Sequence, residues 1–145
     1  MQSSQPRAAA TLVVTCNILA QPSAVYNAWT SESLLSKWFT LDDGLVTVVH
    51  IQPMIAGDFL LVQSREDQLL LHYSGTYLAL EPPERLSFSL LVPEYFLEEV
   101  RVDVIISPAE KGSLLHLTQT GGSGGFSKSE WKVLLTQLKL SLEYQ

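Results

Sequence analysis

The sequence predicts an α+β domain: seven antiparallel strands form one curved sheet, two short helices close one end, and a long C-terminal helix lies over the concave face. Three observations predict this class. Residues 127–143 have the apolar period of an amphipathic helix, residues 45–120 have the alternation of strands, and the connections within that range are short. A helix with one apolar side needs an apolar surface to cover, and a twisted sheet offers one.

The first element is predicted to be a strand over residues 11–19, because this segment is apolar and rich in β-branched residues. Residues 1–10 lack such a pattern and are predicted to be a flexible tail. We find no internal repeat and no linker further on. Residues 11–145 are therefore predicted to form a single domain.

Two short helices are predicted after the first strand. Pro22 suits an early helical position, and the first helix is expected to end near Thr30. Ser31 is predicted to cap the second helix. The apolar residues at helical spacing in these two segments are Val25, Tyr26, Trp29, Leu34, Leu35 and Trp38. Each helix therefore has one side that must be buried.

Six further strands are predicted. Their ranges are 45–51, 58–64, 69–80, 85–92, 97–107 and 113–120. Asp42-Asp43-Gly44 precedes the first of them as a turn, and Arg65-Glu66-Asp67-Gln68 forms a hairpin turn. Gly75 indicates a bulge or bend inside its strand. The cleanest alternation of apolar residues with polar ones is at Val100, Val102, Val104 and Ile106. Because the turns are short, neighbours in sequence are expected to pair antiparallel.

The long C-terminal helix is predicted from Ser127 to Glu143. Its apolar residues fall on one helical face, and they are Trp131, Leu134, Leu135, Leu138 and Leu142. Ser127 and Glu130 have the spacing of a capping box, in which the hydroxyl and the carboxylate each satisfy a backbone N–H at the helix start.

Composition excludes several classes of function. The 145 residues are 46% hydrophobic and 17% charged, with a formal net charge of −6, which is typical of a globular protein. The acidic balance argues against nucleic-acid binding and against anionic membranes. No apolar run approaches the ~20 residues of a membrane-spanning helix. The single cysteine, Cys16, excludes an internal disulfide, and a cytoplasmic location is predicted.

Polar motifs predict neither a cofactor nor a metal. The glycine-rich segment 121–125 with Lys128 resembles a phosphate-binding loop, but Ser127 stands where that motif requires glycine, and no βαβ unit follows. A turn is the preferred interpretation. The three histidines, His50, His72 and His116, lack metal-ligand spacing. His116 alternates with leucines and is expected to face solvent, whereas His72 has apolar neighbours on both sides and is a candidate for an inward position.

Four segments, in the same order along the chain, resemble one known family. They are Pro22–Trp38 with its paired tryptophans, Gly75–Phe88, Gly112–Gln119, and the helix around Trp131. Together they are similar to the activator of heat-shock-protein-90 ATPase homologue family, within the helix-grip superfamily that includes START domains and birch-pollen-allergen-like proteins. Ala56-Gly57 and Glu130 stand where the family often has Gly-Gly and Gly. These two departures leave the shape of the pocket open.

The resemblance implies a cavity between the C-terminal helix and the curved sheet. Pockets of this kind are mostly apolar with a few polar groups. The residues expected to line it and bind a ligand are Trp38, Phe39, Phe59, His72, Tyr73, Phe88, Gln119, Trp131 and Leu135. Ordinary core packing is the alternative for each of them. The expected ligand is a hydrophobic or aromatic small molecule, lipid- or polyketide-like.

Two other functions stay open at this point. The first is an enzyme of cyclase, dehydrase or hydrolase type, which would need an inward polar pair such as His72 with Gln119 or Tyr73. The second is stimulation of a chaperone ATPase through an exposed face, as the family name implies. No catalytic residue is assigned. A homodimer through an exposed strand edge is also left open.

Overall fold

The computed structural model describes residues 11–41, 44–65, 69–121 and 124–143. Four expectations therefore fall wholly or partly outside the described residues: the tail at 1–10, the turn at Asp42-Asp43, the hairpin turn at 66–68, and the centre of the glycine-rich segment at 122–123. None of the helices in the described ranges is long and apolar enough to span a membrane.

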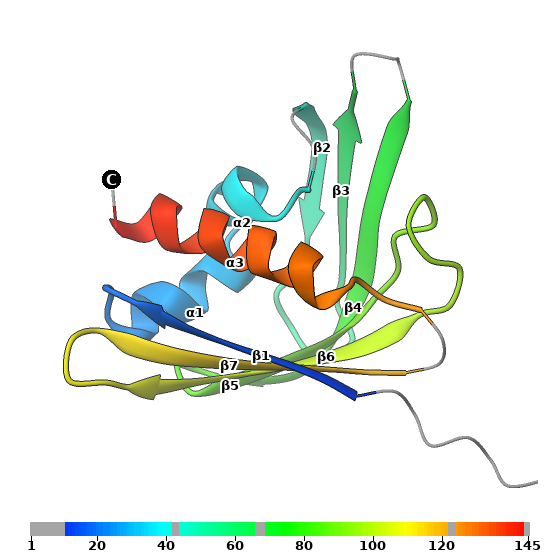
Figure 1. Cartoon of the computed structure of the whole chain (residues 1–145). Coiled ribbons are helices and arrows are strands. Elements are labelled where there is room, and N and C mark those ends of the chain that lie inside the picture. Colours follow the sequence, from blue (N-terminus) through cyan, green and yellow to red (C-terminus); the bar gives the residue numbers. More distant parts are fainter. Residues whose placement is uncertain (1–10, 42–43, 66–68, 122–123, 144–145) are drawn as a thin grey trace, which may run out of the picture.

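The strands form one antiparallel seven-stranded sheet in the order β1-β7-β6-β5-β4-β3-β2 (Figure 1). Their bounds are Thr11–Ile18 for β1, Leu45–Ile51 for β2, Asp58–Ser64 for β3, Leu70–Glu81 for β4, Arg85–Leu90 for β5, Val100–Pro108 for β6 and Ser113–Thr120 for β7. An isolated bridge between Ser74 and Leu91 continues the pairing of β4 beyond β5. From β2 to β7 each strand pairs with the next one in sequence, and β1 closes the row beside β7, so β1 and β2 are the edges.

One face of the sheet is apolar and carries the core. In β6 the four predicted inward residues are all buried, whereas Arg101 and Ile105 between them are exposed. The register places Val104 opposite Leu86 on one side and opposite Leu117 on the other, and all three are fully buried. The alternation predicted from the sequence is confirmed here.

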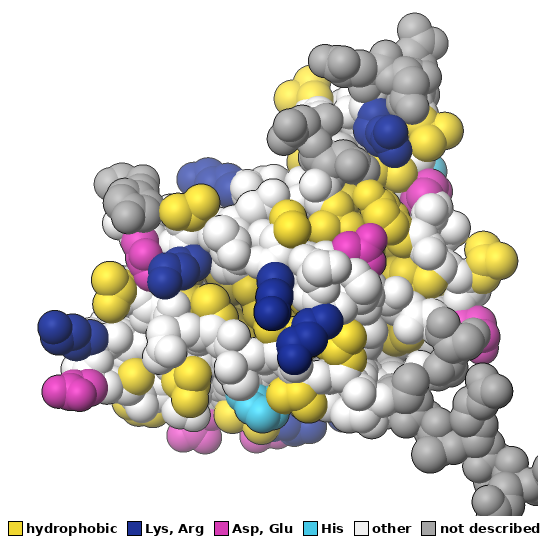
Figure 2. Space-filling model, viewed as in Figure 1, with side chains coloured by type: hydrophobic (Ala, Val, Ile, Leu, Met, Phe, Trp, Pro, Cys, Tyr) yellow, Lys and Arg dark blue, Asp and Glu magenta, His cyan; other side chains and the backbone are white. Residues whose placement is uncertain are grey.

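The long helix α3 (Lys128–Glu143) crosses the inner side of the sheet (Figure 1). Trp131, Leu134, Leu135 and Leu138 are buried, as their spacing predicts. The capping box is confirmed: Glu130 N donates to Ser127 Oγ at 3.1 Å, and Ser127 N donates to Glu130 Oε1 at 2.8 Å. Lysines lie on the outward side of the helix, where Figure 2 shows basic side chains in contact with solvent. The fold is consistent with a helix-grip architecture.

The two short helices are α1 (Pro22–Thr30) and α2 (Glu32–Trp38). They are joined by Ser31, which occupies the N-cap position of α2 with an extended backbone. Its side chain makes no capping hydrogen bond, and its Oγ lies 3.3 Å from Ser33 Oγ instead. The predicted N-cap position is therefore confirmed, whereas the predicted capping hydrogen bond is wrong. The buried indole of Trp38 donates to Ala28 O at 2.9 Å and fixes the corner between the helices.

The connection between β5 and β6 is longer than predicted. β5 ends at Leu90 and β6 begins at Val100, whereas the sequence predicted strands to 92 and from 97. Val92 O accepts the backbone N–H groups of Tyr95 and Phe96 at 2.8 and 2.9 Å, which forms a tight turn in place of a strand. The ring of Phe96 packs on Phe126, 5.3 Å between centroids, and draws the loop toward the start of α3.

Candidate functional site

An internal cavity lies between the α1–α2 corner and the middle of the sheet. Its lining residues are all buried, and they are Trp29, Leu35, Phe39, Phe59, Tyr77 and Phe88. Five of the six are aromatic. The cavity volume is about 10 Å³, which is room for one water molecule at most. The space between these side chains is therefore filled almost completely by their own rings.

The walls of the cavity come from elements that the fold brings together. Phe59 of β3, Tyr77 of β4 and Phe88 of β5 project from the inner face, and the register sets Tyr77 directly opposite Phe88. Gly75 stands opposite Phe59, and a Cβ at this position would meet the Phe59 ring at 2.6 Å as well as Ser89 O. Glycine is therefore required here to give the Phe59 ring its place.

Phe39, the residue that follows α2, is the centre of the ring cluster. Its ring centroid lies 5.2 Å from Trp38, 6.3 Å from Trp29 and 6.3 Å from Trp131. It also lies 6.5 Å from Phe59 and 6.4 Å from Phe88. Edge-to-face and tilted pairs of this kind stabilise a core beyond the area they bury. They also explain why so little empty volume remains.

Two tyrosines place their hydroxyl groups within the core. Tyr77 Oη donates to Trp29 O at 2.8 Å, which ties β4 to the end of α1. Burial raises the pKa of Tyr77, and the nearby Tyr26 adds to the rise, so the phenol stays protonated. Tyr73 Oη donates to Gln63 Oε1 at 3.0 Å and accepts Leu41 N at 3.1 Å.

Only some of the residues predicted to bind a ligand line the cavity. Phe39, Phe59 and Phe88 line the cavity, while Trp38, Tyr73, Trp131 and Leu135 are buried in the surrounding core. Trp29, Leu35 and Tyr77 also line the cavity and are not among the residues predicted to do so. The helical spacing of Trp29 and Leu35 predicts burial, but it cannot show which buried residues border empty space.

The position of the cavity also differs from the expectation. It lies beneath α1 and α2, whereas the resemblance implied a cavity beneath the C-terminal helix. The reason is that α3 is already packed against the core through Trp131, Leu134, Leu135 and Leu138, which are 0–2% exposed. Little space is left under α3 itself.

Gln119 faces inward, as predicted, and its amide is occupied by the protein. Its Oε1 accepts Phe126 N at 3.0 Å and Trp131 Nε1 at 2.8 Å, and its Nε2 donates to Phe126 O at 2.9 Å. Gly125, with φ of +97°, passes so close that a Cβ there would lie 2.5 Å from the Gln119 amide. Gln119 therefore joins β7 to the start of α3.

The inward position considered for His72 is wrong. Its side chain is 44% exposed on the outer face of β4, and Nδ1 lies 3.1 Å from Glu94 Oε2, while His72 N donates to Glu94 Oε1 at 2.8 Å. Burial opposes ionisation of Glu94, but the hydrogen bonds with the His72 backbone and side chain, the hydrogen bond from its own backbone and the electrostatic attraction of His72 together lower the pKa of the carboxyl. In the ranges that are described, no three His, Cys, Asp or Glu side chains are grouped to hold a metal ion.

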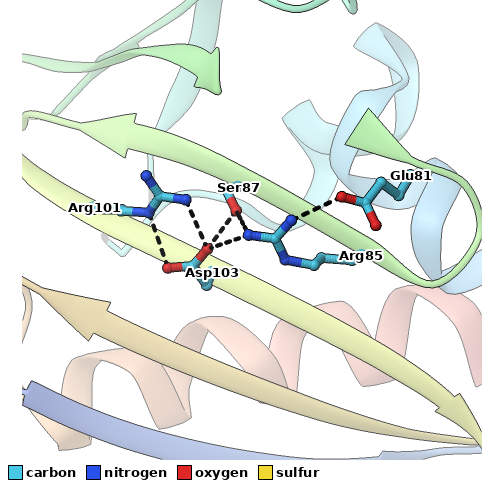
Figure 3. Close-up of polar contacts among 5 residues, drawn as sticks. All are labelled: Glu81, Arg85, Ser87, Arg101 and Asp103. Atoms are coloured by element: carbon cyan, nitrogen blue, oxygen red, sulfur yellow. Dashed lines mark hydrogen bonds and ion pairs between the residues drawn. The ribbon is translucent and has the colours of Figure 1, made fainter. Parts of the chain in front are cut away.

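A charged network lies on the outer face of the sheet (Figure 3). Arg101 Nε and Arg85 Nη2 approach Asp103 from its two sides, at 3.1 and 3.3 Å, and Ser87 Oγ donates to Asp103 Oδ1. Arg85 Nη1 also donates to Glu81 Oε2 at 2.8 Å. These side chains cover Ser87, which is fully buried although it faces away from the core. The network holds β4, β5 and β6 together from outside.

The contribution of this network to the free energy of unfolding is expected to depend on pH. Burial disfavours the Asp103 carboxylate, but hydrogen bonds from Arg101 and Ser87 and the charges of Arg101 and Arg85 lower its pKa below the ordinary 3.8. Because the folded pKa is depressed, the stabilisation is fully present above about pH 4 and is lost as pH falls through the folded pKa. We expect Asp103→Asn to lower the free energy of unfolding by about 1–2 kcal/mol at pH 7, and by less at pH 3.

Urea unfolding of the wild type and Asp103→Asn at the two pH values measures this difference. Glu110→Gln, on an exposed turn between β6 and β7, is the matched control for loss of one negative charge. An equal cost of Asp103→Asn at pH 7 and pH 3 would contradict the assignment.

Comparison with known proteins places the chain in a family. The family described as "Activator of Hsp90 ATPase homolog 1-like protein" matches residues 19–143. No curated protein matches the sequence. Among solved structures, protein CV1439 from Chromobacterium violaceum is similar with a TM-score of 0.81 and 20% identity, over 93% of this chain and 98% of that one. An AHSA1-like protein from Aeromonas hydrophila gives 0.77 and 18%, over 94% and 97%.

At these identities the solved structures support the fold alone, and a protein from Rhodobacter sphaeroides agrees with them, at a TM-score of 0.79 and 21% identity over 91% of both chains. The family match covers most of the chain and includes α1, α2, the six strands from β2 to β7 and α3. The chain belongs to the Activator of Hsp90 ATPase homolog 1-like family, within the helix-grip superfamily.

Proposed function

We propose that this protein binds a small, uncharged aromatic compound between the α1–α2 corner and strands β3–β5. The observation that carries the proposal is the internal cavity walled by aromatic rings. Apolar cavities in proteins take up small ring compounds when the volume suffices, and the favourable term is removal of the guest's surface from water.

The size of the cavity restricts the guest. A pocket for a drug-sized ligand measures at least about 300 Å³, whereas this cavity measures about 10 Å³. A lipid- or polyketide-sized molecule, as expected from the resemblance, does not fit in this conformation. The proposed guest is therefore a compound of one or two rings, and its binding requires one wall to move outward.

The segment Trp38–Leu41 is the wall best placed to move. Phe39 points into the cavity, whereas the next residue, Thr40, lines a surface groove of about 510 Å³ together with Val46 and Gln137. One short stretch of chain thus separates the cavity from solvent. Gln137 Nε2 on α3 donates to Trp38 O at 2.7 Å and to Thr40 O at 2.8 Å, so one side-chain amide makes two hydrogen bonds between α3 and this segment. Leu41 N is held separately, by Tyr73 Oη at 3.1 Å.

The catalytic alternative has no support in the described lining. An acid–base pair in the cavity would need two titratable groups, and Tyr77 is the one titratable residue among the six that line it. His72, the group considered for this role, lies on the opposite face of the sheet. Stimulation of a chaperone ATPase, which the family description names, stays a prediction for this chain.

The proposal is tested by methyl NMR of Leu35, whose side chain borders the cavity. Titration with indane, a compound of two fused rings, is expected to shift the Leu35 methyl signals saturably. Gln137→Leu is expected to speed association, because it removes the two hydrogen bonds from α3 to Trp38 O and Thr40 O. Thr136→Ala, at the exposed neighbouring position on α3, is the matched control and should leave the rate unchanged. No shift at Leu35 up to the solubility limit, in the wild type and in Gln137→Leu, would refute the proposal.

A further inference from the structure

The indole N–H of Trp29 is a buried hydrogen-bond donor with no partner among the described residues. Trp29 is 2% exposed and is one of the six residues that line the cavity. A buried donor left unpaired is destabilising, and such groups are uncommon in folded proteins. This N–H therefore needs a physical explanation.

The neighbouring polar groups of the aromatic core are all paired. The indole N–H of Trp38 donates to Ala28 O at 2.9 Å, and that of Trp131 donates to Gln119 Oε1 at 2.8 Å. The hydroxyl of Tyr77 donates to the backbone oxygen of Trp29 itself, at 2.8 Å. The unpaired donor is thus found on the tryptophan that borders empty space, and the two indoles packed away from the cavity have oxygen acceptors.

Ring packing gives the Trp29 N–H at most a weak acceptor. The Trp29 and Trp38 rings meet edge to face, with 4.6 Å between centroids and 77° between planes. A ring face accepts an N–H more weakly than an oxygen does. An oxygen of a bound compound within reach of this N–H would therefore be the stronger acceptor.

We propose that Trp29 Nε1 donates a hydrogen bond to an oxygen of the bound compound, so that the site selects a small ring compound bearing a carbonyl or ether oxygen. This inference rests on the proposed function and adds the chemical class of its ligand. The hydroxyl of Tyr77, the other polar side chain of the lining, already donates to Trp29 O. A charged ligand is disfavoured, because the lining residues offer it no opposite charge and burial of an unpaired charge is costly.

The test compares two compounds of similar shape, indane and 1-indanone, which differ by one carbonyl oxygen. Dissociation constants are measured by NMR titration for the wild type and for Trp29→Phe, which keeps an aromatic ring and lacks the N–H. The ratio of the two constants within each protein removes the effect of the smaller ring. We expect the relative preference for 1-indanone to fall about tenfold in Trp29→Phe, the value of one hydrogen bond.

Trp131→Phe is the matched control. It also removes an indole N–H from the core, but one that is bonded to Gln119 Oε1 and lies outside the Trp38–Leu41 segment, so the ratio of the two constants should stay as in the wild type. The same ratio in the wild type and in Trp29→Phe overturns the inference and leaves the proposed function standing. Failure of both compounds to bind the wild type overturns the proposed function and the inference with it.

A second readout needs no variant. The wild type has three indole N–H groups, those of Trp29, Trp38 and Trp131, whose signals can be followed during a titration. We expect 1-indanone to move the Trp29 proton downfield more than indane does. The other two signals serve as internal references, because their protons already have oxygen acceptors. Equal shifts of the Trp29 signal with both compounds would contradict the hydrogen bond.

Discussion

Replacement of Trp131 by alanine is expected to lower the free energy of unfolding by about 3–5 kcal/mol. The side chain is fully buried under α3, its ring lies 5.5 Å from Phe126 and 6.3 Å from Phe39, and its N–H is bonded to Gln119. Truncation would leave a cavity at the point where α3 begins and an amide oxygen with one partner fewer. The helix would lose its strongest attachment to the sheet.

Urea denaturation followed by circular dichroism measures this loss. Val133→Ala, two residues along the same helix at a position 46% exposed, is the matched control and should cost about 0.5 kcal/mol or less. A cost below about 1.5 kcal/mol for Trp131→Ala would mean that the helix is held mainly by its leucines.

Gln119→Leu is expected to be as costly, at about 3–5 kcal/mol, although it exchanges side chains of similar volume. The amide satisfies three buried groups, the N–H and C=O of Phe126 and the indole N–H of Trp131, and each unsatisfied group costs about 1–3 kcal/mol. Thr118→Val is the control. Thr118 precedes Gln119 in β7 and lies on the outer face of the sheet, so this substitution should change the free energy of unfolding little.

A double-mutant cycle can confirm the origin of this cost. Trp131→Phe removes the indole N–H and keeps a ring, so Gln119→Leu in that background leaves one group fewer unpaired. We expect the two substitutions together to cost less than the sum of their separate costs, by about 0.5–3 kcal/mol. Strict additivity would show that the Gln119–Trp131 hydrogen bond contributes nothing.

The fold could be predicted from the sequence because the two kinds of periodicity in it are clear. The stripe from Trp131 to Leu138 and the alternation from Val100 to Ile106 both describe a single buried side, and the structure places both in the core. Local chemistry was also informative where it involves neighbours in sequence, as in the capping box of Ser127 and Glu130. Ser31 shows the limit, since its side chain bonds to Ser33 Oγ where a cap was expected.

The site could be predicted only in part, because it depends on contacts between distant segments. His72 is paired with Glu94, and nothing near either residue in sequence indicates that pairing. Apolar residues flank His72 on both sides, but Leu70 is 47% exposed, so apolar neighbours did not identify the inward face of this strand. The volume of the cavity is set by how rings from β3, β4, β5 and both short helices fit together, which no pattern in one segment determines.

We propose that the aromatic interior beneath α1 and α2 opens to admit a small ring compound. Nuclear Overhauser contacts between 1-indanone and the isotope-labelled protein test this opening most directly. We expect contacts to the Leu35 methyl groups and to the ring protons of Phe59 and Phe88. Contacts confined to Val46 and Leu140, which line the surface groove beside Thr40, would contradict this opening, and so would the absence of contacts at saturating 1-indanone.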